Sequence, residues 1–186
     1  MKTLVLHYSH TGNNEWLARK IVTTLNCDSE PITPRLNLLP FLILFSLLKK
    51  SPGVKPLKHR VEEYDAVIVV GPIWMGQLIL PLYSVIKKYR KRMKQLYFAT
   101  CCGSEDAKKD DKFGYGSVFE QVKSIAGDTC VHCEAFPIGL VLPLEQREDS
   151  KAMMAARLSD ENFTGVLQQR FFEFIGRITS AAENEK

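Results

Sequence analysis

A polar, glycine-containing stretch near the start of the sequence has the residue types that bind an anion. It comprises Ser9, His10, Thr11, Gly12, Asn13 and Asn14. It follows an apolar run and leads into residues 13–25, where apolar residues recur with helical spacing. Hydroxyls and backbone N–H groups at the start of a helix hold a phosphate, and the helix dipole adds to the attraction. Because the stretch has no Lys or Arg and is neither a Walker loop nor a Gly-x-Gly-x-x-Gly turn, it predicts a phosphate site without a cation. The alternative is an ordinary strand-to-helix turn capped by Ser or Asn.

Two later stretches also follow an apolar run. Pro72, Ile73, Trp74, Met75 and Gly76 follow residues 66–70, and Cys101, Cys102, Gly103 and Ser104 follow residues 95–100. In a parallel sheet, ligands bind at the carboxyl ends of the strands, so these residues are candidates for one site. Trp74 offers an apolar face to a flat ring. Taken alone, Trp74 also fits a core aromatic.

The elements that must position these stretches alternate along the chain. Apolar runs at residues 3–8, 66–70, 95–100 and 130–142 are continuous rather than alternating, which is typical of parallel strands buried on both faces. Helical spacing covers residues 13–25, 78–92, 116–126 and 162–179. We also expect an edge strand within residues 28–34 and a helix at 41–50. With 186 residues, the pattern predicts one doubly wound α/β domain spanning residues 1–186.

These loops together resemble those of the flavodoxin family. That family's phosphate loop reads Ser/Thr-x-Thr-Gly-x-Thr, and residues 9–14 match it except at Asn14, whose amide can still donate to a phosphate. Residues 64–76 resemble the family's second flavin loop, with an aromatic after a Gly-Pro turn, and residues 100–104 resemble the third. The resemblance covers the whole chain in order. It implies a three-layer α/β/α sandwich with a five-stranded parallel sheet in the order 2-1-3-4-5. It also implies that FMN binds to residues 9–14, 72–76 and 101–104, with Phe113 or Tyr115 as further candidates to fold onto the ring.

The five cysteines raise a separate question. Their odd number, without a visible secretory signal, favours free thiols in a cytoplasmic protein. Cys101-Cys102 and Cys130-x-x-Cys133 suggest a metal site, but we expect the two pairs at opposite ends of neighbouring strands. Residues three apart in a strand also point to opposite faces, so we expect Cys130 and Cys133 to be separate, buried thiols and predict no metal. His7 is interpreted as a satisfied core histidine. No triad or carboxylate pair stands out, so we predict no catalytic side chain.

Three functions fit these loops and the fold that they imply. The first is an FMN-dependent oxidoreductase that acts on a quinone or similar apolar acceptor, with NAD(P)H as a candidate donor. The second is a flavodoxin-type electron carrier between protein partners, and the third is a binding module without turnover. Carriers of this family are typically acidic, so the formal net charge of +4 favours the first. That charge is mild, and the basic residues are not interleaved with aromatics along one stripe, so it does not indicate nucleic acid. Residues 36–48 are predicted to form an apolar wall near the flavin, for an acceptor or a membrane surface, or else a core layer or homodimer contact.

Overall fold

The sheet has the predicted order. The computed structural model describes residues 1–35, 53–107 and 114–183. Its main sheet consists of β1 (Thr3–His7), β2 (Asp28–Pro31), β3 (Ala66–Val70), β6 (Gln95–Cys102) and β7 (Cys130–Pro137). The strands lie in the order β2-β1-β3-β6-β7, and every pair is parallel. Because β4 and β5 belong to a separate hairpin, this is the 2-1-3-4-5 order expected from the sequence.

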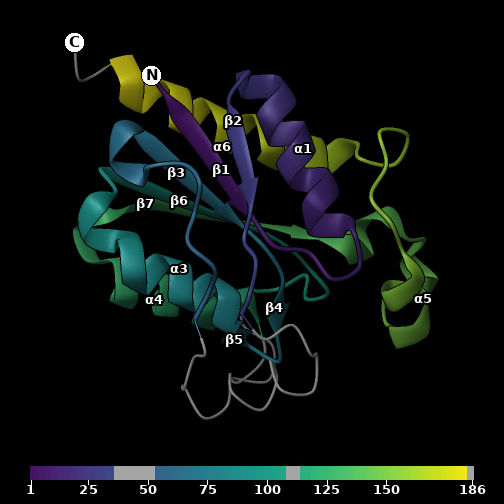
Figure 1. The fold of residues 1–186 in the computed structure, drawn as a ribbon. Helices are drawn as coiled ribbons and strands as arrows, with labels where there is room; N and C mark the ends of the chain where they lie inside the picture. Colours follow the sequence, from purple (N-terminus) through teal and green to yellow (C-terminus); the bar gives the residue numbers. More distant parts are fainter. Residues whose placement is uncertain (36–52, 108–113, 184–186) are drawn as a thin grey trace.

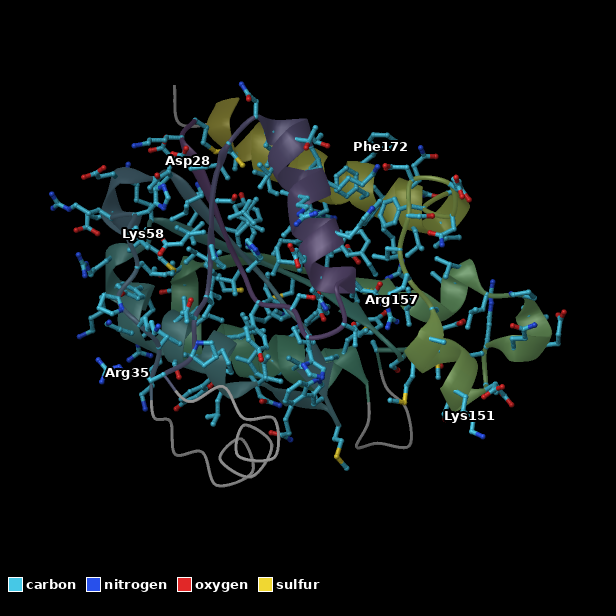
Figure 2. All side chains as sticks on the ribbon, turned by 45° about the vertical axis from the view of Figure 1, so that its right-hand side comes forward. Asp28, Arg35, Lys58, Lys151, Arg157 and Phe172 are labelled. Carbon is cyan, nitrogen blue, oxygen red and sulfur yellow. The ribbon has the colours of Figure 1, made fainter. Side chains whose placement is uncertain are left out.

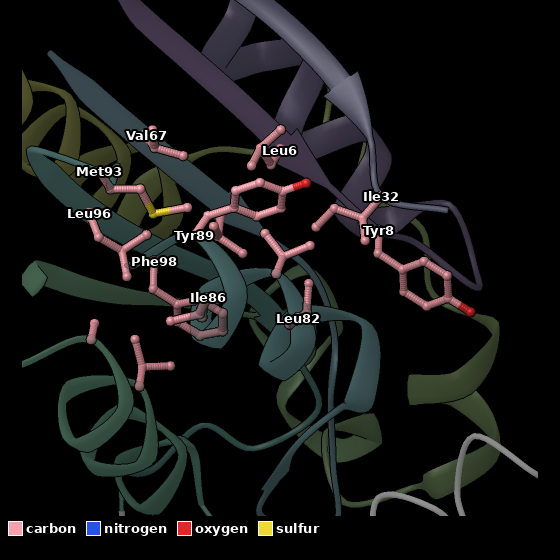
Figure 3. Close-up of a cluster of buried hydrophobic side chains, with 14 of the residues drawn as sticks. Leu6, Tyr8, Ile32, Val67, Leu82, Ile86, Tyr89, Met93, Leu96 and Phe98 are labelled. Atoms are coloured by element: carbon pink, nitrogen blue, oxygen red, sulfur yellow. The ribbon is translucent and has the colours of Figure 1, made fainter. Parts of the chain in front are cut away.

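Helices cover both faces of this sheet, which gives three layers (Figure 1). On one face, α1 (Asn13–Leu25) and α6 (Gly165–Glu183) pack against side chains such as Val5, Ile68 and Tyr97. On the other face lie α3 (Leu80–Tyr89) and α4 (Tyr115–Ala126). Figure 3 shows this second layer, where Leu82, Ile86 and Tyr89 of α3 meet Leu6, Val67 and Phe98 of the strands. β1, β3 and β6 are buried on both faces, as their continuous apolar runs indicate. In the part of the chain that the structure describes, no helix is both long and apolar enough to cross a membrane.

Several predicted elements begin or end at different residues than expected. The strand predicted at residues 130–142 ends at Pro137, because proline has no N–H to continue the ladder, and a 3-10 turn follows at Ile138–Val141. The helix predicted at 78–92 is shorter, because Leu78 belongs to β5 (Gln77–Leu78) and the last turn, Arg90–Arg92, is 3-10. β5 pairs antiparallel with β4 (Ile73–Trp74) in a short hairpin. The prediction for residues 41–50 falls outside the described residues.

The expectation that Cys130 and Cys133 point to opposite faces is wrong. Cys130 is opposite Leu96 of β6, but the next partners are His132 and Tyr97, so Val131 is an extra residue in a β-bulge. The bulge shifts the alternation by one residue and brings the two Sγ atoms to 3.7 Å from each other. The other pair does lie at the far end of the strands, since Cys101 and Cys102 are opposite Phe136 and Pro137.

Candidate functional site

The three strand-end loops converge on one cavity of about 860 Å³. This volume lies in the range of small-molecule and cofactor sites. Most of the predicted site residues line it, namely His10, Thr11, Asn13, Asn14, Pro72, Ile73, Trp74, Met75, Cys101, Cys102 and Gly103. Of the described residues that line the cavity, none is Lys, Arg, Asp or Glu. The predicted residues Ser9, Gly12, Gly76 and Ser104 support the loops from outside the lining.

The first loop leaves the start of α1 open. Gly12 stands at the N-cap with φ of 95°, a left-handed conformation that glycine adopts without a steric penalty. No described side chain caps the helix there. The Ser9 hydroxyl accepts a hydrogen bond from the Gly12 N–H at 3.1 Å, which closes the loop on itself. The first N–H groups of a helix have no partner within the helix, so this uncapped end retains donors and a positive dipole end.

Asn14 has a structural role that was not predicted from the sequence. Its side chain is buried, and its Oδ1 accepts a hydrogen bond from the Cys101 N–H at 2.8 Å. Its Nδ2 donates to the Cys101 carbonyl at 3.0 Å. Asn14 therefore joins the first loop to the third. These two bonds use one of the two Nδ2 hydrogens, so donation of the other to a phosphate stays a prediction.

Asn13 makes the equivalent pair of bonds to a different segment. Its Nδ2 donates to the carbonyl of Ala156 at 3.1 Å, and its Oδ1 accepts from the N–H of Leu158 at 3.0 Å. The start of α1 is therefore held between the end of β6 and the chain that follows α5 (Ser150–Ala155). In Figure 2, Lys151 lies on α5 and Arg157 in the segment that leads from it back toward α1.

The second loop is the β4–β5 hairpin. Met75 and Gly76 form its turn with φ of 50° and 68°, the backbone that a tight two-residue hairpin requires. The Gly76 carbonyl accepts hydrogen bonds from Ser117 Oγ and Gln121 Nε2, which ties the turn to α4. The hairpin presents Trp74, which is half-buried: it packs against the core and also lines the cavity. Trp74 therefore packs on the core, as one interpretation of the sequence expects, and its contact with a flat ring stays a prediction.

His10 joins the first two loops, since its ring lies edge-on to that of Trp74 with centroids 6.2 Å apart.

The third loop contributes buried, neutral thiols. Burial raises the pKa of Cys101 far above its ordinary value and raises that of Cys102 to about 12. Cys102 Sγ donates to the Ser104 carbonyl at 3.5 Å, and Ser104 Oγ donates to the Asp106 carbonyl, so both polar groups are used within the loop. The cysteines therefore act here as small apolar groups rather than as nucleophiles.

Part of the lining was not predicted from the sequence. The additional residues are Gln77, Ile79, Ile138, Ser150, Met153 and Met154. Ile138 directly follows β7, so the rule that ligands meet strand ends would have found it. α5 has a local signal, because the Asp149 carboxylate caps its first turn by accepting from the N–H groups of Lys151 and Ala152. Nothing in the nearby sequence places that helix beside the cavity.

Two other predicted residues lie elsewhere. Tyr115 stands at the start of α4 with its ring on Phe119, outside the cavity lining, and Phe113 is outside the described residues. His7 is half-buried, but its Nδ1 is buried without a hydrogen-bond partner among the described residues, so the interpretation as a satisfied histidine is wrong. Burial lowers the pKa of His7, which favours the neutral ring.

Comparison with solved structures identifies the type of fold. No protein-family model matches the sequence, and no curated protein does. Solved structures do match. A flavoprotein described as putative, from Bacteroides eggerthii, is 20% identical with a TM-score of 0.61, covering 83% of this chain and 94% of the other. The fold is flavodoxin-like.

Two further structures share this flavodoxin-like fold. A flavoprotein from Lactobacillus acidophilus, solved in complex with FMN, is 12% identical with a TM-score of 0.59 over 72% of this chain and 92% of its own. A short-chain flavodoxin associated with a bacterial microcompartment is 15% identical with a TM-score of 0.50. The match covers 98% of this chain and 99% of the flavodoxin. At these identities, the likeness concerns the arrangement of the chain.

Proposed function

We propose that this chain binds FMN in the cavity at the carboxyl ends of β1, β3 and β6 and acts as an FMN-dependent oxidoreductase. The observation that carries the proposal is the pairing, within one cavity of about 860 Å³, of an uncapped helix start with an apolar, tryptophan-bearing wall. FMN needs both, because it joins a terminal phosphate to a flat ring. The flavoprotein from Lactobacillus acidophilus, which shares the fold, was solved with FMN.

The start of α1 is the proposed phosphate site. Its open backbone N–H groups attract a dianion without a cation. The exposed Thr11 hydroxyl adds a side-chain donor at the cavity wall. Asn13 and Asn14 act indirectly, since their side chains hold the helix start against the neighbouring segments.

The remaining wall suits the flavin ring and an apolar acceptor beside it. Ile73, Trp74 and Met75 come from the hairpin, and Met153 and Met154 come from α5. Methionine side chains are flexible and polarisable, so they adapt to flat ligands of different outline. We therefore favour a quinone or similar acceptor as the substrate.

FMN supplies the redox chemistry when it is bound. The protein's own contribution is to bind, orient and shield. The absence of charged groups among the described lining residues keeps the cavity apolar and limits the entry of water. We assign the protons of the reaction to solvent and name no lining side chain as a general acid or base.

Steady-state assays test the oxidoreductase proposal. The FMN-loaded protein, supplied with NADH or NADPH, is expected to reduce members of a quinone panel. Stripping FMN should abolish this turnover, and adding FMN back should restore it. Stable FMN binding without turnover for any donor and acceptor would contradict the enzyme assignment and favour an electron carrier that exchanges electrons with protein partners.

A further inference from the structure

Two thiols far from the cavity lie close enough to react with each other. Cys130 Sγ and Cys133 Sγ are 3.7 Å apart at the amino end of β7. The cavity is at the other end of the sheet, since Cys130 is opposite Leu96 while Cys102 lines the cavity. The six residue steps from Leu96 to Cys102 span about 20 Å at the usual rise of a strand. The pair is therefore separate from the proposed flavin site.

The bulge at Val131 is what brings the thiols together. In a regular strand, residues three apart face opposite sides of the sheet. The extra residue turns both cysteines toward α3 and α4, where Cys133 belongs to the core and Cys130 packs at its edge. Bulges are structural features rather than defects, and they commonly re-aim a side chain.

The two thiols differ in access. β7 is the last strand of the sheet, and Cys130 is partly exposed there, whereas Cys133 is only 8% exposed. A reagent from solvent can therefore reach Cys130 first, and Cys133 lies behind it. Within the described residues, no group of three His, Cys, Asp or Glu side chains could hold a metal, so the pair has no further metal ligand.

We propose that Cys130 and Cys133 form a redox-active dithiol that a low-molecular-weight disulfide oxidises to an intrachain disulfide. Cys130 is the attacking thiol and Cys133 the resolving thiol. No group of the flavin site takes part.

The electrostatic surroundings agree with this assignment. A hydrogen bond from the Cys133 thiol lowers the pKa of Cys130, and the positive charge of Lys123 on α4 lowers it further against the effects of burial and Glu120. The same contact raises the pKa of Cys133. Burial raises the pKa of the other three cysteines, Cys27, Cys101 and Cys102. Cys130 is therefore the cysteine most readily present as the nucleophilic thiolate.

The reaction balances in two steps. Cys130 gives its proton to solvent and attacks one sulfur of the small disulfide, whose S–S bond breaks as the new one forms; the departing half takes up a proton as a free thiol. Cys133 then loses its proton, now without the negative charge of Cys130 beside it, and attacks the Cys130 sulfur. The second half leaves as a thiol. Overall, the two cysteines lose two electrons and two protons, and the small disulfide is reduced to two thiols. The distance between the two Sγ atoms must fall from 3.7 Å to about 2.05 Å. Rotation of the two side chains and adjustment of the bulged backbone supply this movement.

Peptide mapping of the full chain tests the proposal. The protein is equilibrated with mixtures of oxidised and reduced glutathione, the free thiols are alkylated, and the peptides are analysed by mass spectrometry. The peptide with Cys130 and Cys133 should lose two hydrogens, escape alkylation and retain no glutathione. Cys133→Ser should accumulate glutathione on Cys130, Cys130→Ser should show neither product on this peptide, and Cys27→Ser should behave like the wild type.

The wild-type protein also provides a test that needs no variant. Phenylarsine oxide bridges pairs of neighbouring thiols, so one equivalent should protect both cysteines from alkylation. Three results would each overturn the proposal. Both thiols could remain open to alkylation under excess oxidised glutathione, glutathione could stay attached to Cys130 in the wild type, or the arsenical could fail to protect the pair.

Discussion

The side-chain amide of Asn14 forms two hydrogen bonds with the backbone of Cys101, one from the Cys101 N–H at 2.8 Å and one to its carbonyl at 3.0 Å. The bonds are buried and join residues 87 positions apart. They fix the start of α1 against the end of β6, and so set the distance between the two loops that meet at the cavity. An amide is suited to this because it presents an acceptor oxygen and a donor NH2 group side by side.

Replacing Asn14 with Ala should therefore destabilise the protein even without a ligand. The Cys101 N–H and carbonyl would lose their buried partner, at a cost of about 2–4 kcal/mol in the free energy of unfolding. Urea denaturation of the apoprotein measures this. Thr11→Ala is the matched control, because Thr11 is exposed in the same loop and should change the stability by less than about 0.5 kcal/mol. Equal stability of the wild type and Asn14→Ala would show that the two hydrogen bonds do not contribute to the free energy of unfolding.

Thr11→Ala should instead weaken the binding of FMN. Loss of one hydrogen bond to a charged phosphate costs about 1.5–3 kcal/mol, or roughly 10- to 150-fold in the dissociation constant. Riboflavin lacks the phosphate, so its affinity should not change. Fluorescence titrations of both ligands decide the matter: an unchanged affinity for FMN would remove Thr11 from the phosphate site.

Trp74 should influence the redox behaviour of bound FMN. An apolar wall disfavours the negative charge of the reduced flavin. Trp74→Ala should therefore make the reduction potential of the flavin less negative, with a change of roughly 1 kcal/mol in the free energy of reduction. Trp74→Phe, which retains an apolar ring, should stay near wild type, and so should Trp16→Phe, since Trp16 packs on Phe163 outside the cavity lining. Spectroelectrochemical titration gives the potentials. Identical values for Trp74→Ala and wild type would leave Trp74 with only its core role.

The methionines of α5 should affect the acceptor rather than the fold. Met153→Ser and Met154→Ser remove apolar contact at the cavity, so the KM for an apolar quinone should rise several-fold while the melting temperature stays nearly constant. Leu144→Ser is the control, because Leu144 is 76% exposed and does not line the cavity. A rise in KM of the same size in the control would count against a specific role for α5.

Glu30 should make stability depend on pH. Burial raises the pKa of Glu30, but the hydrogen bonds from the backbone N–H groups of His59 and Lys58 and from the His59 ring outweigh it, so the pKa is lowered from its ordinary value of 4.5. A lowered pKa in the folded state means that the stabilisation is present above pH 4.5 and is lost as the pH falls through the folded-state value. Glu30→Gln should be less stable at neutral pH and show a flatter loss of stability in acid. If the free energy of unfolding fell with pH in the same way in Glu30→Gln and in the wild type, this role of Glu30 would be contradicted.

The sequence was a good guide to the sheet and to the three loops. Strands buried on both faces have continuous apolar runs, and the carboxyl ends of parallel strands meet at one edge, so local patterns located both the fold and most of the cavity lining. The hairpin of β4 and β5 was missed, because its two strands are too short for a periodic signal.

Features that depend on distant contacts were not predictable. The roles of Asn13 and Asn14 depend on backbone partners more than 80 residues away. The placement of α5 beside the cavity depends on such contacts as well. The approach of Cys130 to Cys133 depends on a single bulged residue, Val131, which strand alternation does not anticipate. The prediction of an apolar wall at residues 36–48 falls outside the described residues and stays a prediction, as does a cytoplasmic location.

The most direct test of the central claim is a comparison of FMN with riboflavin on the flavin-free protein, monitored through the quenching of flavin fluorescence. The uncapped start of α1 predicts that one FMN binds per chain and that riboflavin binds at least about tenfold more weakly, a difference of about 1.4 kcal/mol that one hydrogen bond to a charged phosphate can supply. Equal affinity for the two ligands, or no binding of FMN, would contradict the account.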